Sequence, residues 1–75
     1  MKISVETGKW AIQYNKETSF TLDLADGSTV LDVINAVGIP EDEAGLVILD
    51  GKSLPNEYVL SDGNSLKIFP VVIGG

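Results

Sequence analysis

Residues 26–40, DGSTVLDVINAVGIP, decide the fold of this chain because they predict one short helix with residues that start and stop it at both ends. Apolar side chains recur there at spacings of three and four residues, the period of an amphipathic helix. They form a single stripe made of Val30, Leu31, Val33, Ile34 and Val37. We therefore expect the helix to pack one face onto a sheet.

Both ends of this helix carry residues that limit its length. Ser28 or Thr29 can cap the amino-terminal end, and Asp32 then lies near the positive end of the helix dipole. At the other end, Gly38 stands where a left-handed cap is needed, and Pro40 cannot continue a helix. The sequence thus predicts a short helix that is closed on both sides.

Four segments around the helix have the pattern of β-strands. Residues 2–6 and 19–24 alternate between apolar and polar side chains, and so do residues 66–70. The inward-facing side chains are Ile3, Val5, Phe20, Leu22, Leu24, Leu66 and Ile68. Pro70 has no N–H to donate, so it ends the last strand or lies at its edge. The apolar run at residues 46–50 is short enough to be a buried central strand. This order of elements predicts an α+β domain.

Two segments between these elements are less regular. In residues 7–18, the side chains of Trp10, Ile12 and Tyr14 alternate as in a strand, but turn-forming residues flank them on both sides. The segment either extends the first hairpin or is an irregular excursion, and its three large side chains are interpreted as packing rather than as a binding patch. Residues 41–45, EDEAG, are interpreted as a solvated acidic loop, and their three carboxylates as solvated side chains rather than a docking patch.

Composition excludes several classes of function. The 75 residues, which make one small domain, include neither Cys nor His, so thiol nucleophiles, histidine acid/base catalysis, disulfides and the usual zinc sites are absent. The net charge of −6 argues against binding to nucleic acid or to an anionic membrane. It favours a partner with a basic surface. No apolar run reaches the roughly 20 residues of a spanning helix, and we expect a cytoplasmic protein.

Several of these pieces together resemble the β-grasp sulfur carriers. The resemblance rests on the DGSTV-DVI helix, the strand ending in LDG, the LSDGNSLKIFP hairpin and the final Gly74-Gly75, and it covers residues 20–75. The family includes the small subunit of molybdopterin synthase and the sulfur carrier of thiamine biosynthesis, both similar in fold to ubiquitin. It implies a mixed sheet of four to five strands with one helix on one face. It also implies a domain at residues 1–70 followed by a flexible tail at residues 71–75.

The resemblance places the reactive group on the α-carboxylate of Gly75. An activating enzyme of the ubiquitin-activating type would join this carboxylate to AMP, using ATP, and a persulfide donor would then supply sulfur to form a thiocarboxylate. Tail residues inserted into the partner's active site would be Val71, Val72, Ile73 and Gly74; the alternative for residues 71–73 is that they continue an edge strand. Phe69 and Pro70 would either contact the partner or simply pack and end the strand. The carrier itself would hold no catalytic residue, metal or bound cofactor.

The recipient of the sulfur is less sharply indicated. The ending FPVVIGG is nearer to the FPP-x-x-GG ending of the molybdopterin synthase subunit than to the usual thiamine ending, which slightly favours molybdopterin. The further partner would then be a large synthase subunit, and otherwise a thiazole synthase. Asp62-Gly63-Asn64 departs from the family's usual Asp-Gly-Asp turn.

Two other functions share the same sequence features. A protein modifier would form the same adenylate, which a lysine amine would then attack to give an isopeptide bond. A plain β-grasp interaction domain would end in Gly-Gly only incidentally, and deletion of Gly75 would leave its function intact.

Overall fold

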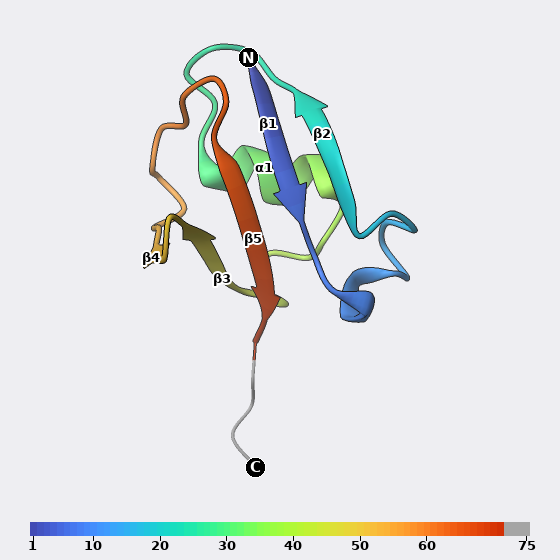
Figure 1. The fold of residues 1–75 in the computed structure, drawn as a ribbon. Helices are drawn as coiled ribbons and strands as arrows, with labels where there is room; N and C mark the ends of the chain where they lie inside the picture. The colour runs from blue at the N-terminus through green and yellow to red at the C-terminus, as the bar shows by residue number, and fades with distance from the viewer. Residues whose placement is uncertain (72–75) are drawn as a thin grey trace.

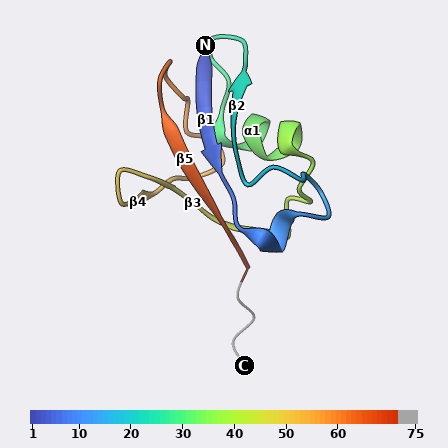
Figure 2. The ribbon, with the colours of Figure 1, turned by 45° about the vertical axis from the view of Figure 1, so that its right-hand side comes forward.

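The computed structural model describes residues 1–71, which fold into a five-stranded mixed sheet with one α-helix on one of its faces (Figures 1 and 2). In chain order the elements are β1 (Lys2–Glu6), the 3-10 helix η1 (Lys9–Ala11), β2 (Ser19–Asp23), α1 (Val30–Val37), β3 (Ala44–Leu49), β4 (Lys52–Ser53) and β5 (Ser65–Pro70). The strand order is β2-β1-β5-β3-β4. This arrangement confirms the predicted α+β fold of the ubiquitin-like β-grasp type.

The last strand, β5, lies at the centre of the sheet. It runs parallel to β1, where Val5 pairs with Leu66, and antiparallel to β3, where Val47 pairs with Ile68. These four side chains are buried on the helix side of the sheet. They meet the apolar stripe of α1, whose buried members are Val30, Val33, Ile34 and Val37.

The prediction of a buried central strand at residues 46–50 is right about an internal strand but wrong about where it begins and how far it is buried. The strand β3 begins at Ala44, and it lies next to the short edge strand β4, which pairs with it over only two residues. Val47 alone is fully buried on β3, whereas Leu46 is 51% exposed on the face opposite the helix. An apolar run does not show which of its side chains are buried, because they point to both faces of a sheet that is covered on one face only.

The helix ends are built as the sequence predicts, with Thr29 rather than Ser28 as the cap. The Thr29 hydroxyl accepts a hydrogen bond from the backbone N–H of Asp32, and the Asp32 carboxylate accepts one from the N–H of Thr29 at 2.8 Å. This reciprocal pair satisfies two backbone donors at once. Gly38 has a φ of 89°, and its N–H donates to the carbonyl oxygens of Ile34 and Asn35.

Replacing the capping residue should lower stability without changing the fold. We expect Thr29→Ala to reduce the free energy of unfolding by about 1 kcal/mol, because the first turn loses its side-chain acceptor. For a domain of this size the loss corresponds to a fall in the melting temperature of about 4–8 °C. Circular dichroism melting measures the change. Thr29→Ser keeps the hydroxyl and should recover most of the loss; equal melting of the two variants would contradict the capping role.

Residues 7–18 form the irregular excursion, and the alternative of an extended hairpin is wrong. The backbone satisfies itself locally: the N–H of Ala11 donates to Gly8, and the N–H of Ile12 donates to Lys9. Ala11 is fully buried and anchors the segment, while Trp10 and Tyr14 pack partly against the core. Ile12 is 52% exposed. Both ribbon views place η1 at the end of the domain where β5 finishes.

Candidate functional site

The end of β5 is the place to look for function, because the predicted reactive residue, Gly75, follows Pro70 by five positions. The strand ends at Pro70, and the N–H of the next residue, Val71, donates to the carbonyl oxygen of Glu43 at 3.1 Å. Of the predicted tail, Val71 is therefore held by the domain. The other predicted site residues, Val72, Ile73, Gly74 and Gly75, lie outside the described residues, so their roles stay predictions.

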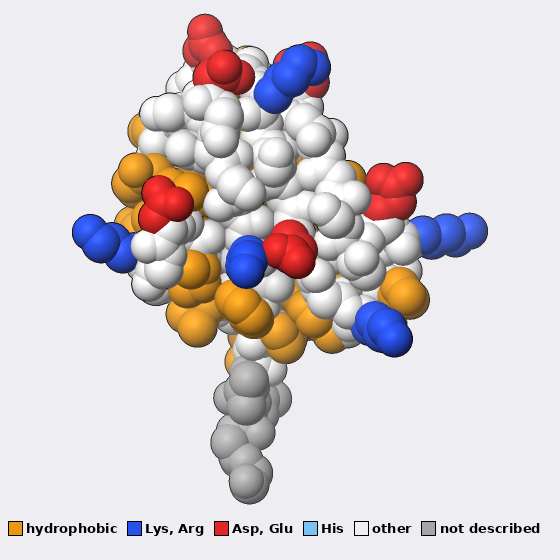
Figure 3. Space-filling model, in the orientation of Figure 1, with side chains coloured by type: hydrophobic (Ala, Val, Ile, Leu, Met, Phe, Trp, Pro, Cys, Tyr) orange, Lys and Arg blue, Asp and Glu red, His pale blue; other side chains and the backbone are white. Residues whose placement is uncertain are grey.

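Phe69 lies on the sheet face that the helix does not cover. It is 45% exposed, and across the ladder it pairs with Leu46, which is exposed to a similar degree. Val71 is 46% exposed, and Trp10 lines two hollows near this strand end, one shared with Phe69 and one shared with Val71. We call Trp10, Leu46, Phe69 and Val71 the open-face patch. Figure 3 shows hydrophobic side chains gathered along this end of the face. Of the two readings of Phe69, the exposed position favours contact with a partner.

Pro70 lies differently from Phe69. It is half-buried, and it pairs with Ala44 at the last position of the ladder between β5 and β3. For Pro70, this position favours packing and strand termination over contact with a partner, as expected for a residue without an N–H.

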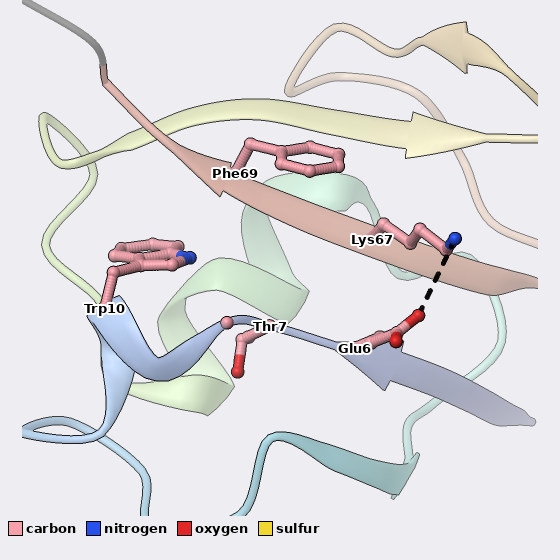
Figure 4. A pocket seen from close by; sticks show the side chains of 6 residues that line it. Glu6, Thr7, Trp10, Lys67 and Phe69 are labelled. Atoms are coloured by element: carbon pink, nitrogen blue, oxygen red, sulfur yellow. Dashed lines mark ion pairs between the residues drawn. The ribbon is translucent and has the colours of Figure 1, made fainter.

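A shallow hollow of about 210 Å³ separates Trp10 from Phe69 (Figure 4). An ion pair between Glu6 and Lys67, 3.8 Å apart, forms part of its wall. Both side chains are more than half exposed, so the pair contributes little to stability. The buried hydroxyl of Thr7 has no hydrogen-bond partner among residues 1–71, but it points away from the two aromatic rings. The hollow offers an aromatic surface with one ion pair in its wall.

The acidic loop is more than a solvated segment. The Glu43 carboxylate accepts a hydrogen bond from the Tyr14 hydroxyl, and Glu41 accepts one from the side chain of Asn56 at 3.2 Å. A second hollow of about 290 Å³ is lined by Trp10, Asp42, Glu43, Pro70 and Val71. The excursion, the acidic loop and the end of β5 thus meet at one point. No spacing in the sequence predicts the contact between Tyr14 and Glu43, because the two residues are 29 positions apart.

Glu43 changes the acidity of Tyr14. The hydrogen bond from the phenol to the Glu43 carboxylate, together with desolvation and the charge of Glu43, raises the pKa of Tyr14 above its ordinary value of 10.0. The folded protein therefore holds this proton more tightly than the unfolded chain does. The resulting stabilisation is present below pH 10 and is lost as the pH rises through the folded-state pKa.

A spectroscopic titration tests this coupling. In a Tyr58→Phe background Tyr14 is the only tyrosine, so phenolate absorbance reports its ionisation alone. We expect a midpoint above pH 10, and a shift back toward the ordinary value when Glu43→Ala removes the acceptor. Asp42→Ala is the control, because the charge of Asp42 contributes least to the raised pKa of Tyr14. A midpoint that Glu43→Ala leaves unchanged would show that the hydrogen bond does not form in solution.

This end of the domain presents an exposed apolar patch beside acidic side chains. Among the described residues no group of three or more carboxylate, thiol or imidazole side chains could hold a metal ion. Within the same residues no helix has the length and apolar character needed to cross a membrane. An exposed apolar patch beside acidic side chains suits a protein partner with an apolar surface and basic residues around it.

Comparisons with known proteins agree with this fold. A family profile described as Mut7-C ubiquitin matches residues 7–73. A protein of Pyrococcus furiosus, provisionally identified as subunit 1 of molybdopterin converting factor, has a TM-score of 0.79 at 20% identity, with 96% of this chain and 99% of that chain covered. SAMP1 of Haloferax volcanii has a TM-score of 0.75 at 16% identity, with both chains covered completely.

A third similar structure is the BexX/CysO complex of Amycolatopsis orientalis, with a TM-score of 0.69 at 23% identity; 97% of this chain and 99% of that chain are covered. At these identities the solved structures show the shared fold. No curated protein matches the sequence.

Proposed function

The chain belongs to the Mut7-C ubiquitin family, and on this premise we propose that it is a sulfur carrier rather than an enzyme. Its Gly75 α-carboxylate attacks the α-phosphate of ATP on an activating enzyme, which forms an acyl adenylate and releases pyrophosphate. The terminal sulfur of a persulfide donor then attacks the acyl carbon and AMP leaves. A thiol cleaves the resulting acyl persulfide, which leaves a thiocarboxylate on Gly75 and a disulfide on the donor side.

The observation that carries this proposal is that the end of β5 lies beside the open-face patch. Val71 is both a member of that patch and the first residue beyond β5. A partner that covers the patch is therefore placed where residues 72–75 can enter its cleft. Glycines at the end of such a tail pass close to a partner's backbone, because they lack a Cβ. Since the chain has no Cys or His, the partners supply the catalytic groups.

The sulfur then goes to a cofactor precursor, and we favour molybdopterin over the thiazole of thiamine. The support is the Phe69-Pro70 pair and the likeness to the Pyrococcus furiosus protein. The partners of this proposal are the activating enzyme, the persulfide donor and a large synthase subunit. A thiazole synthase takes the last place if thiamine is the recipient.

Protein modification is the second candidate. One observation favours it: a structure with a TM-score of 0.75 to this chain is described as small archaeal modifier protein 1. In that case a lysine amine replaces the persulfide as the nucleophile, and the product is an isopeptide bond at Gly75. The two functions share every step up to the adenylate.

Intact-mass measurement separates these candidates. The untagged protein is incubated with ATP, a persulfide donor, a thiol and the host's activating enzyme. A mass gain equal to the replacement of one oxygen by sulfur, absent when ATP is omitted, supports the carrier. Conjugates that form when lysine-containing proteins are added instead support the modifier. If the adenylate forms in neither case with an enzyme that activates a known carrier, the interaction-domain alternative replaces both.

A further inference from the structure

We propose that Tyr14, Glu43 and Gly45 form a clamp that fixes Val71 and thereby sets the direction in which the tail leaves the domain. The inference rests on the proposed function, because it concerns how the reactive chain end is aimed. It concerns positioning residues only, since none of the three would touch the reacting atoms. We call these three residues the tail clamp.

Gly45 is the residue of the tail clamp that lies closest to the backbone at the end of β5. The register between β3 and β5 shifts there: Ala44 pairs with Pro70 and Leu46 with Phe69, so Gly45 is the extra residue of a β-bulge. A Cβ on Gly45 would lie 2.5 Å from the carbonyl oxygen of Pro70 and 2.7 Å from the nitrogen of Val71. These contacts are with backbone atoms, which no change of rotamer can move. Glycine is therefore required by space, and its absence would displace the start of the tail.

Glu43 joins the tail to the rest of the domain. Its carbonyl oxygen accepts the N–H of Val71, its carboxylate accepts the Tyr14 hydroxyl, and its own N–H donates to Pro40 at 2.9 Å. On the other side, the N–H of Tyr14 donates to the carbonyl oxygen of Ala11 at 2.9 Å, and Ala11 is fully buried. The excursion thus links Val71 through Glu43 to a core residue.

The clamp matters because four residues separate Val71 from the reactive carboxylate. Those residues span at most about 14 Å, so when a partner's cleft holds them extended, a rotation of about 10° at Val71 displaces the chain end by about 2 Å. A misplacement of about 1 Å can slow an enzymatic step by about 100-fold. With the open-face patch docked, the exit direction at Val71 decides whether the carboxylate meets the ATP phosphate.

Steady-state kinetics with the activating enzyme test the clamp. We expect Gly45→Ala to lower the kcat of adenylate formation by about 10-fold to 100-fold, with KM for the carrier changed less than about threefold. Phe69→Ser alters the docking patch instead, and should raise KM with little change in kcat. Gly27→Ala is the matched control: Gly27 has a φ of 88°, and its Cβ would have no neighbour within 4 Å among the described residues. The Gly27→Ala variant therefore introduces backbone strain at a position far from Val71.

Two further measurements keep the test independent of folding. Tyr14→Phe removes only the phenol oxygen, and we expect a twofold to fivefold loss of kcat, about the effect of one hydrogen bond that acts indirectly. Amide hydrogen exchange at Val71 should accelerate in Gly45→Ala and stay unchanged in Gly27→Ala. A Gly45→Ala protein with wild-type kcat, or with a loss matched by Gly27→Ala, would overturn the proposal.

Failure of the proposed function would be visible separately. If the wild-type protein is not adenylated by an enzyme that activates a known carrier, the carrier proposal fails, and the kinetic role of the clamp fails with it. Exchange at Val71 still decides the structural part: faster exchange in Gly45→Ala supports the clamp, and unchanged exchange overturns it.

Discussion

Deletion of Gly75 is expected to abolish ATP-dependent sulfur loading while leaving the domain folded. The shortened chain still ends in a carboxylate, now on Gly74, but that group lies one residue, about 3.4 Å, short of its place in the activating enzyme. Since a misplacement of about 1 Å already costs about 100-fold, we expect a loss of at least about 1,000-fold. Intact mass after incubation with ATP and the persulfide donor measures the loss.

Two controls define what this result would mean. Circular dichroism melting should be the same for the shortened and full-length chains, because the core consists of residues up to Ile68. An added glycine after Gly75 displaces the carboxylate in the opposite direction, and it should also prevent loading. If the shortened chain gains sulfur as the full-length chain does, the reactive group is elsewhere and the proposed role of Gly75 is wrong.

The elements that the sequence predicts correctly are those encoded locally. The helix α1 has its stripe, its cap at Thr29 and its stop at Gly38 within a dozen residues. The strands β1 and β5 alternate without interruption, and their inward side chains are buried as expected. Patterns of this kind need no knowledge of the neighbours in space. The resemblance to the β-grasp sulfur carriers rests on these elements together with the Gly-Gly ending.

The rest of the site depends on contacts that are distant in the sequence. Gly45 reads as part of a polar loop, and only the approach of Pro70 shows why a side chain cannot fit there. Tyr14 reads as a packing residue, yet it binds Glu43. The alternation in residues 7–18 suggested a strand, but a local turn provides hydrogen-bond partners for the backbone N–H groups there. Tertiary contacts override local preference in these places.

The open-face patch was missed for a related reason. Leu46 and Val47 are equally apolar, and the sequence does not tell which of them points to the helix. The register with β5 decides it, because Val47 pairs with the buried Ile68 and Leu46 with the exposed Phe69. A one-residue change of register would exchange the two faces.

Replacing Leu66 by alanine is expected to remove a large part of the total stability. Leu66 is 0% exposed and lies on the central strand of the sheet. It pairs with Val5 of the neighbouring strand and belongs to the same core cluster as the apolar stripe of the helix. Leucine-to-alanine changes in such positions cost about 2–5 kcal/mol. A chain of this length has about 4–11 kcal/mol of stability in all, so the variant should be partly unfolded at the lower end of that range. Urea denaturation measures the change.

Leu46→Ala makes the matched comparison, because it is the same substitution on the opposite face of the sheet. Leu46 is already half exposed, so we expect its removal to change the free energy of unfolding by only about 0.5 kcal/mol. Its effect should fall on docking, where Leu46 lies beside Phe69. Equal losses of stability in the two variants would mean that the open face is packed in solution. The difference expected here assigns the inner face of the sheet to folding and leaves its outer face free for a partner.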